Sequence, residues 1–98
     1  MLFIAKFTDK PNSSELRDKL LSAHFKWLDE NKKKVLVPGS LRPDVDGPSL
    51  GGLWIIEADS KAEVDEIFKT DPFYANGLRA KVEVYFWKKA FEDRKVPI

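Results

Sequence analysis

The stretch Leu53-Trp54-Ile55-Ile56-Glu57-Ala58 decides how the rest of the chain has to fold. Its apolar residues fill both alternating positions, so a strand over residues 53–58 carries large side chains on both of its faces. Residues 39–52, just before it, are rich in glycine and proline, which predicts a long irregular connection. A loop of that length in a small domain is a place to look for function.

The segment after this strand predicts a helix from Ser60 to about Thr70. Ser60 and Glu63 have the spacing of a capping box, and the residues that follow supply an apolar stripe at helical spacing. Pro72 disfavours the helical region for Asp71, so the helix should end before these two residues.

Three further strands are expected. Residues 2–7 are rich in strand formers and precede a cluster of turn residues at 8–12. Residues 35–37 form a short strand that Pro38 should end, and residues 80–87 alternate cleanly between apolar and polar. One side of this last strand is wholly apolar: Val82, Val84 and Phe86. Gly77 before it can supply the positive φ of a turn.

A long helix is predicted from about Ser13 to about Asn31. Asn12 followed by Glu15 resembles a capping box, and apolar residues then recur at helical spacing. The residues of this stripe are Leu16, Leu20, Leu21, Trp27 and Leu28.

The order β-α-β-β-α-β is the ferredoxin-like arrangement, an α+β fold in which a four-stranded antiparallel sheet carries both helices on one face. The other sheet face is then bare, although strands 2–7 and 53–58 put apolar side chains on both sides. Contiguous apolar patches mark interfaces, so we expect a homodimer formed through the open sheet face. The alternative is that the tail, residues 88–98, folds over this face.

Composition narrows the choice of partners and compartment. The 98 residues predict one domain over 1–98, and a net charge of +1 gives no field that would gather nucleic acid or anionic lipid. The chain has no cysteine, which removes disulfides and thiol chemistry. The apolar run at residues 2–5 is too short for a signal peptide, so the expected location is the cytoplasm and no membrane association is expected.

His24 is the only histidine, and it falls in the middle of the apolar arc of the first helix. Arg17 lies one heptad earlier on the same line. A lone histidine on an apolar face is more often a core residue than a catalyst, so a catalytic role needs a partner. Asp71 could reach the same region, where a carboxylate would orient the imidazole for general acid-base work. An aspartate before proline is also a common turn residue, and periodicity alone leaves both interpretations open.

The chain resembles the YciI-like (YCII-related) family over nearly its whole length. The motifs that carry this resemblance are His24-Phe25-Lys26-Trp27-Leu28, Pro38-Gly39-Ser40-Leu41, Gly52-Leu53-Trp54-Ile55-Ile56, Thr70-Asp71-Pro72-Phe73 and Gly77-Leu78. Their order and spacing are specific, although each motif alone is weak. Pro38-Gly39-Ser40 stands where the family usually has Ala-Gly-Pro.

The resemblance implies a dimeric α+β barrel in which two four-stranded sheets face each other. It also implies an active site containing His24 and Asp71, with Ser40 and Arg42 of the following loop as substrate contacts. The wider superfamily includes small enzymes that act on aromatic or quinone-like compounds without an organic cofactor. The full set of predicted substrate-binding residues is Arg17, Ser40, Arg42, Trp54 and Phe73.

Other functional patterns are weak. Residues 44–47 resemble part of a calcium loop, but Arg42 stands at the first ligand position and no glutamate follows at the required spacing. RNA recognition motifs share the strand and helix order, yet residues 51–58 lack the expected basic and aromatic octapeptide. We therefore predict no metal, no cofactor and no nucleic-acid partner.

Two functions remain open at this point. The first is a small cofactor-independent enzyme, a lyase, isomerase or hydrolase, in which His24 and Asp71 are catalytic and Arg17 or Arg42 steadies an anionic or enol-like group. The second is a non-catalytic module that binds a small molecule, with His24 as a hydrogen-bonding wall of the pocket.

Overall fold

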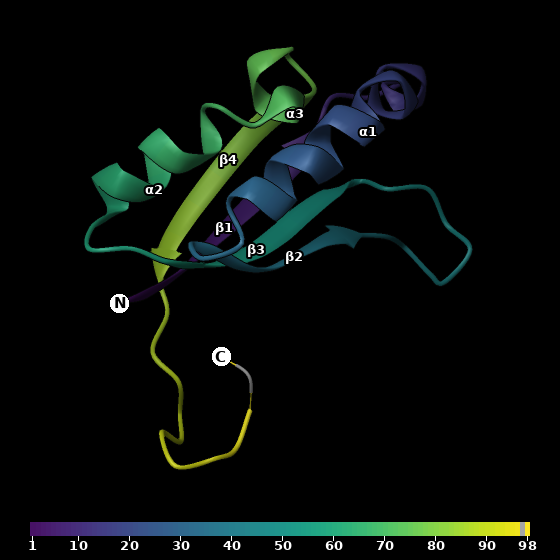
Figure 1. Ribbon diagram of the computed structural model, residues 1–98. Coiled ribbons are helices and arrows are strands. Elements are labelled where there is room, and N and C mark those ends of the chain that lie inside the picture. The colour runs from purple at the N-terminus through teal and green to yellow at the C-terminus, as the bar shows by residue number, and fades with distance from the viewer. Residues whose placement is uncertain (97) are drawn as a thin grey trace.

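The computed structural model describes residues 1–96 and 98 and contains one sheet with helices packed against it (Figure 1). The sheet order is β2-β3-β1-β4, and every neighbouring pair is antiparallel. The elements in chain order are β1 (Leu2–Asp9), α1 (Ser14–Glu30), β2 (Val35–Leu41), β3 (Gly51–Glu57), α2 (Lys61–Phe68), α3 (Pro72–Ala75) and β4 (Arg79–Phe86). This is the predicted ferredoxin-like α+β fold, with a short third helix added.

All three helices lie on the same face of the sheet (Figure 1). The core forms between them and the inward-facing side chains of the central strands, which meet in register: Ala5 lies opposite both Trp54 and Val84. The largest inward side chains, Phe7 and Trp54, pack at 4.5 Å between ring centroids. Burying such aromatic surface against the helices is the main stabilising term for this side of the sheet.

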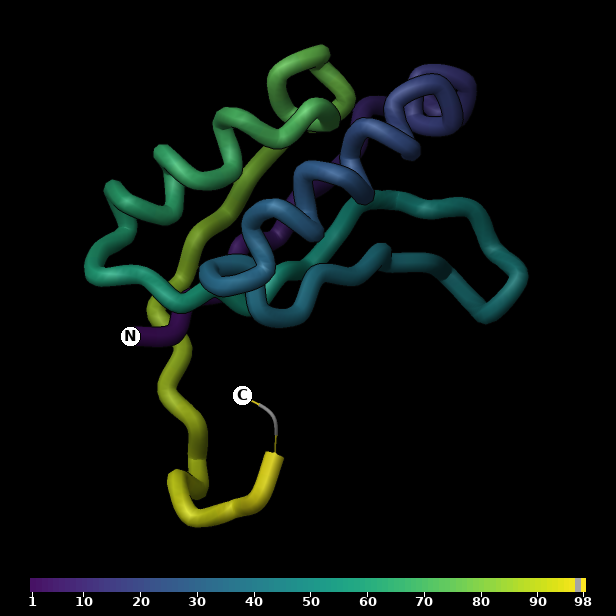
Figure 2. Tube along the Cα trace, in the orientation of Figure 1, coloured from purple at the N-terminus to yellow at the C-terminus, as the bar shows by residue number. Residues whose placement is uncertain are grey.

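The other face of the sheet has no helix over it (Figure 1). Four apolar side chains, one from each strand, stand directly opposite one another across this open face: Val37, Ile55, Ile4 and Tyr85. The tail after β4 leaves the sheet beside the N-terminus and curls away from the helices (Figure 2). Val37 and Tyr85 stay 43% and 53% exposed, so the tail does not cover this row.

Two strands continue at their C-terminal ends beyond the residues that their sequence patterns predict. β1 continues to Asp9 because Thr8 and Asp9 still pair with β4. The sequence predicted that β2 stops at Pro38, but the strand continues to Leu41. β2 is an edge strand, and proline is tolerated there because one side of the strand needs no partner for its backbone N–H. The irregular loop is therefore confined to residues 42–50.

The helix starts differ in how they are capped. Ser60 accepts a hydrogen bond from the Glu63 backbone N–H, which confirms Ser60 as the N-cap of α2, while the Glu63 carboxylate accepts from the backbone N–H of Asp59. For α1 the expected cap at Asn12 is wrong: the N-cap is Ser13, and Asn12 sits in the left-handed region with φ 58°. Gly77 has the predicted positive φ, 79°. Within the described residues, no helix has the length and apolar character needed to cross a membrane.

Candidate active site

His24 and Asp71 meet in the interior between α1 and the start of α3. The Nδ1 atom of His24 lies 2.6 Å from Oδ1 of Asp71, and the two residues are 4% and 0% exposed. An ionised Asp71 accepts a hydrogen bond from Nδ1–H, and in a neutral imidazole this contact selects the tautomer that leaves Nε2 as the acceptor. The sequence left open whether these residues meet, and the structure brings them together.

Asp71 is held by the helix that follows it. It is the N-cap of α3, with the extended backbone that Pro72 favours, and its Oδ1 also accepts a hydrogen bond from the Phe73 backbone N–H. Its second oxygen, Oδ2, is buried and has no partner among the described residues. The turn interpretation of Asp71 is therefore correct, and the same carboxylate also contacts His24.

An aromatic side chain supports the back of the imidazole. The Phe73 ring lies parallel to the His24 ring, with centroids 3.8 Å apart and an angle of 11°. Phe73 is fully buried and does not line the cavity, so it supports His24 and lies out of reach of a ligand. The Trp54 ring lies 6.1 Å from the imidazole and does line the cavity.

A cavity of about 510 Å³ opens in front of His24, a size that suits a small organic molecule. It lies between α1, the sheet and the β2–β3 loop, which projects beyond the end of the sheet at which α1 begins (Figure 2). The predicted site residues on its wall are Arg17, His24, Ser40, Arg42 and Trp54. Because Nδ1 is occupied by Asp71, Nε2 is the ring nitrogen left for a ligand in this cavity.

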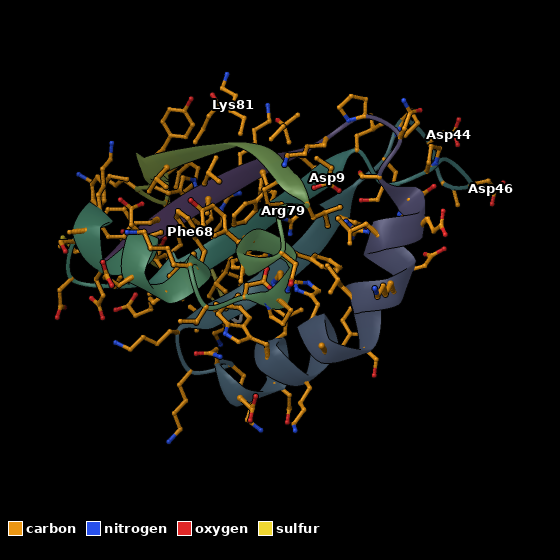
Figure 3. The ribbon with its side chains drawn as sticks, turned by 90° about the horizontal axis from the view of Figure 1, so that it is seen from above. Asp9, Asp44, Asp46, Phe68, Arg79 and Lys81 are labelled. Atoms are coloured by element: carbon orange, nitrogen blue, oxygen red, sulfur yellow. The ribbon has the colours of Figure 1, made fainter. Side chains whose placement is uncertain are left out.

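The β2–β3 loop supplies one wall of the cavity. The Arg42 Nε–H donates to Ser40 Oγ at 3.0 Å, and Nη1 donates to the Gly47 carbonyl at 2.9 Å. Both partners are neutral, so the charge of Arg42 is not balanced by these contacts. Asp44 and Asp46, the residues of the weak calcium pattern, lie on the outer part of the loop (Figure 3).

The sequence analysis missed a second ionic cluster at the cavity. Asp9 accepts hydrogen bonds from Arg17 at 3.0 Å and from Arg79 at 2.7 Å. Arg79 is 8% exposed, and its guanidinium carbon lies 4.5 Å from the centre of the Phe7 ring, an arrangement that favours a buried cation. The sequence signal for this residue is misleading, since strict alternation back from Val82 puts Arg79 on the opposite face of β4.

Charges around the cavity act on one another. Burial lowers the pKa of Arg17; the Asp9 carboxylate opposes this shift, and the charges of Arg79 and Arg42 lower the pKa further. The three guanidinium groups are therefore close enough to repel. Among the described residues, no three histidine, cysteine, aspartate or glutamate side chains are grouped so that they could hold a metal ion.

Comparison with protein families gives a match to the YCII-related domain over residues 1–88, nearly all of the chain. The chain belongs to the YCII-related family. The match ends two residues after β4 and leaves out most of the tail. The resemblance carried by the motifs around His24 and Asp71 is thereby confirmed.

Two solved structures place this YCII-related protein among known folds. One is 5-chloro-2-hydroxyhydroquinone dehydrochlorinase from Burkholderia phenoliruptrix in complex with 2,5-dihydroxybenzoquinone, with 34% identity and a TM-score of 0.81 over 90% of this chain and 94% of that chain. The other is the protein Atu4242 from Agrobacterium tumefaciens, with 18% identity and a TM-score of 0.53 over 92% and 94% of the two chains, a likeness of fold alone. No curated protein matches the sequence.

Proposed function

We propose that this YCII-related protein is a small enzyme that transfers a proton to or from a hydroxylated aromatic or enol-like substrate through His24. The observation that carries the proposal is the 2.6 Å contact between His24 and the buried carboxylate of Asp71 at the wall of a cavity of about 510 Å³. A buried carboxylate that orients an imidazole towards a cavity is the usual arrangement of a histidine general base.

The similar dehydrochlorinase supports the choice of reaction. Its substrate is a chlorinated hydroxyhydroquinone, and its complex holds a dihydroxybenzoquinone. The corresponding reaction here is an elimination. Nε2 of His24 takes a proton from the substrate, the electron pair released moves into the ring system, and a leaving group departs as an anion with its bonding pair. Atoms and charge balance, and no external oxidant or reductant is needed.

The other predicted residues around His24 take distinct roles in this proposal. Asp71 orients His24 and stabilises the imidazolium that forms. Trp54 offers its indole as a wall for a planar ring, while Ser40 at the end of β2 and Arg42 in the loop contact the substrate. Phe73 supports the imidazole from behind instead of touching the substrate, because it does not line the cavity.

A substrate panel with a matched variant tests the proposal. Chlorinated and unsubstituted hydroquinones and hydroxyhydroquinones are incubated with the protein, and conversion is followed by absorbance and by chromatography of products. We expect turnover of at least one compound, and His24→Gln should lower kcat about 100-fold or more because a general base is lost. Full activity of His24→Gln would remove the proposal. Binding without conversion by the native protein would favour the ligand-binding module instead.

We also propose that two copies pair through the open sheet faces. The supporting observation is the row Val37, Ile55, Ile4 and Tyr85, in which Val37 and Tyr85 are exposed and Ile4 and Ile55 are half-buried. An apolar side chain left fully in water forfeits ~1.5–3 kcal/mol of burial. Sedimentation tests this: Ile4→Glu should convert a dimer to a monomer, while Ala23→Glu on the exposed side of α1 should not. A native protein that sediments as a monomer contradicts the proposed dimer.

The single domain over 1–98 and the cytoplasmic location stay predictions.

A further inference from the structure

A bulge in the sheet sets up the ionic cluster beside the cavity. In the pairing of β1 with β4, Thr8 lies opposite Lys81, but Asp9 lies opposite Arg79, so the register skips Ala80. A bulge of this kind re-aims the side chains beyond it. Arg79 therefore points to the helix side of the sheet, where it lies next to Asp9 (Figure 3).

Asp9 divides its carboxylate between two guanidinium groups. Oδ1 accepts from Arg79 and Oδ2 from Arg17, and Asp9 itself does not line the cavity. Both arginines do line it. Asp9 thus stands behind them and fixes two planar donor groups whose remaining N–H groups are available on the cavity side.

Positive charge at the cavity exceeds the negative charge that pairs with it. Three arginines line the wall: Arg17, Arg42 and Arg79. The carboxylate of Asp9 binds both Arg17 and Arg79. In the hydrogen bonds of the described residues, Arg42 contacts only neutral oxygens. Asp18 also lines the cavity, but it is exposed to solvent. The lining of the cavity therefore carries more positive than negative charge.

The Arg79 guanidinium has an unmet donor. Its Nε is buried and finds no hydrogen-bond partner among the described residues, a costly state for a buried charged group. Its Nη2 lies 3.6 Å from the place where a Cβ would stand on Gly52, a glycine that also lines the cavity. The Arg79 side chain is thus buried, charged and incompletely paired beside the cavity.

The N-terminal end of α1 faces the same cavity. Ser13, Ser14 and Arg17, from the cap and first turn of this 17-residue helix, line the wall. The positive end of the helix dipole adds to the field of the arginines. Among the arginine, lysine, aspartate and glutamate side chains that line the cavity, only the exposed Asp18 is negative, so the lining together with the helix end favours a negatively charged ligand.

We propose that Arg17, Arg42 and Arg79, with Asp9 as the positioning residue, form an anion-binding subsite, and that the ligands of this protein carry an ionised oxygen on a planar ring, either a carboxylate or a phenolate. The subsite deepens the proposed function by naming the charge of the substrate. It holds the ionised oxygen while the ring lies beside Trp54 and His24. Anion binding itself requires no turnover, so the two proposals can fail separately.

Benzoate and benzamide, two rings of equal size that differ in charge, test the subsite. Their affinities are measured by NMR titration at fixed salt with the native protein and with His24→Gln. We expect both proteins to bind benzoate about tenfold or more tightly than benzamide. Equal affinities in the native protein would overturn the subsite and leave His24-dependent turnover as a separate question. If His24→Gln still prefers benzoate, the subsite is supported. If His24→Gln also keeps full turnover, the proposed function is removed while the subsite stands.

Three variants locate the effect. Arg79→Gln and Arg42→Gln should each weaken benzoate binding by about tenfold and leave benzamide binding unchanged. Arg94→Gln, which removes an exposed guanidinium from the tail, should change neither. Because Arg79 is buried and Arg42 is exposed, Arg42→Gln provides a second measurement that does not depend on a change in the core. If Arg42→Gln and Arg94→Gln behave alike, the subsite is overturned.

Discussion

The imidazole of His24 and the carboxylate of Asp71 form a buried contact of 2.6 Å across 47 positions of sequence. The contact depends on α3, because Asp71 is its N-cap and the Phe73 side chain of the same helix packs flat on the imidazole. A four-residue helix therefore places the acceptor and the support of His24 together. Two predictions about Asp71 follow from this double role.

Asp71→Ala should destabilise the protein by about 2–4 kcal/mol, since it removes a helix cap and leaves Nδ1–H of His24 buried without an acceptor. Asp71→Asn keeps an oxygen for that N–H and for the Phe73 backbone, so it should lose less stability. Urea unfolding of the two variants measures the difference. Equal losses would show that the hydrogen bonds to Oδ1 do not stabilise the fold.

Gly51→Ala should be strongly destabilising. A Cβ at this position would stand 1.9 Å from the Phe7 carbonyl oxygen, which is backbone and cannot turn aside. The expected cost is about 1–3 kcal/mol or more, as for other overpacked sites. Gly39→Ala is the matched control, because its Cβ would meet only the Leu53 carbonyl oxygen at 3.9 Å. Thermal unfolding of both variants tests this, and similar melting temperatures would contradict it.

Ser60→Ala should cost about 1 kcal/mol through loss of the α2 cap. Ser60 Oγ accepts from the Glu63 backbone N–H at 3.1 Å. Ser22→Ala, at an exposed position inside α1, removes the same hydroxyl without a capping role and should be neutral or slightly stabilising. Denaturant midpoints of the two variants provide the measurement. A loss in Ser22→Ala as large as in Ser60→Ala would argue against the capping explanation.

Acid sensitivity should depend on Glu63. A hydrogen bond from the Asp59 backbone N–H, and to a smaller extent one from Lys34, holds the pKa of Glu63 below the ordinary value for a glutamate. A carboxylate with a lowered folded-state pKa stabilises the protein above the unfolded value, and this contribution is lost as pH falls through the folded pKa. Glu63→Gln should therefore lower stability at neutral pH and flatten the decline below about pH 4.5.

The control for this prediction is Glu66→Gln, an exposed position on the same helix. Its unfolding free energy should follow the native pH dependence. Stability is measured by urea unfolding at several pH values for the native protein and both variants. If Glu63→Gln declines in acid as steeply as the native protein, the contacts of Glu63 do not cause the acid loss.

Local patterns predicted much of the fold. The cap at Ser60, the positive φ at Gly77 and the apolar face of Val82 and Val84 depend on neighbours in sequence, and the structure agrees with each. The errors occur where pairing overrides local preference. Pro38 does not end β2, because hydrogen bonding to β3 holds the strand beyond it.

The candidate site divides in the same way. Periodicity placed His24 and Arg17 on the inner face of α1, because a helix turns by a constant angle per residue. The contact of His24 with Asp71, and the position of Arg79 beside Asp9, depend on how distant segments pack. For Arg79, one skipped residue in the β1–β4 register reverses the face that alternation assigns.

The sequence by itself thus determined the order of strands and helices, the apolar faces and the inward direction of the histidine, all of which follow from periodicity and local turn chemistry. Only the tertiary structure decided which charged groups meet at the cavity. A hydrogen bond such as that between His24 and Asp71 is sensitive to displacements of an ångström, and such displacements are set by strand register and helix packing across the whole chain.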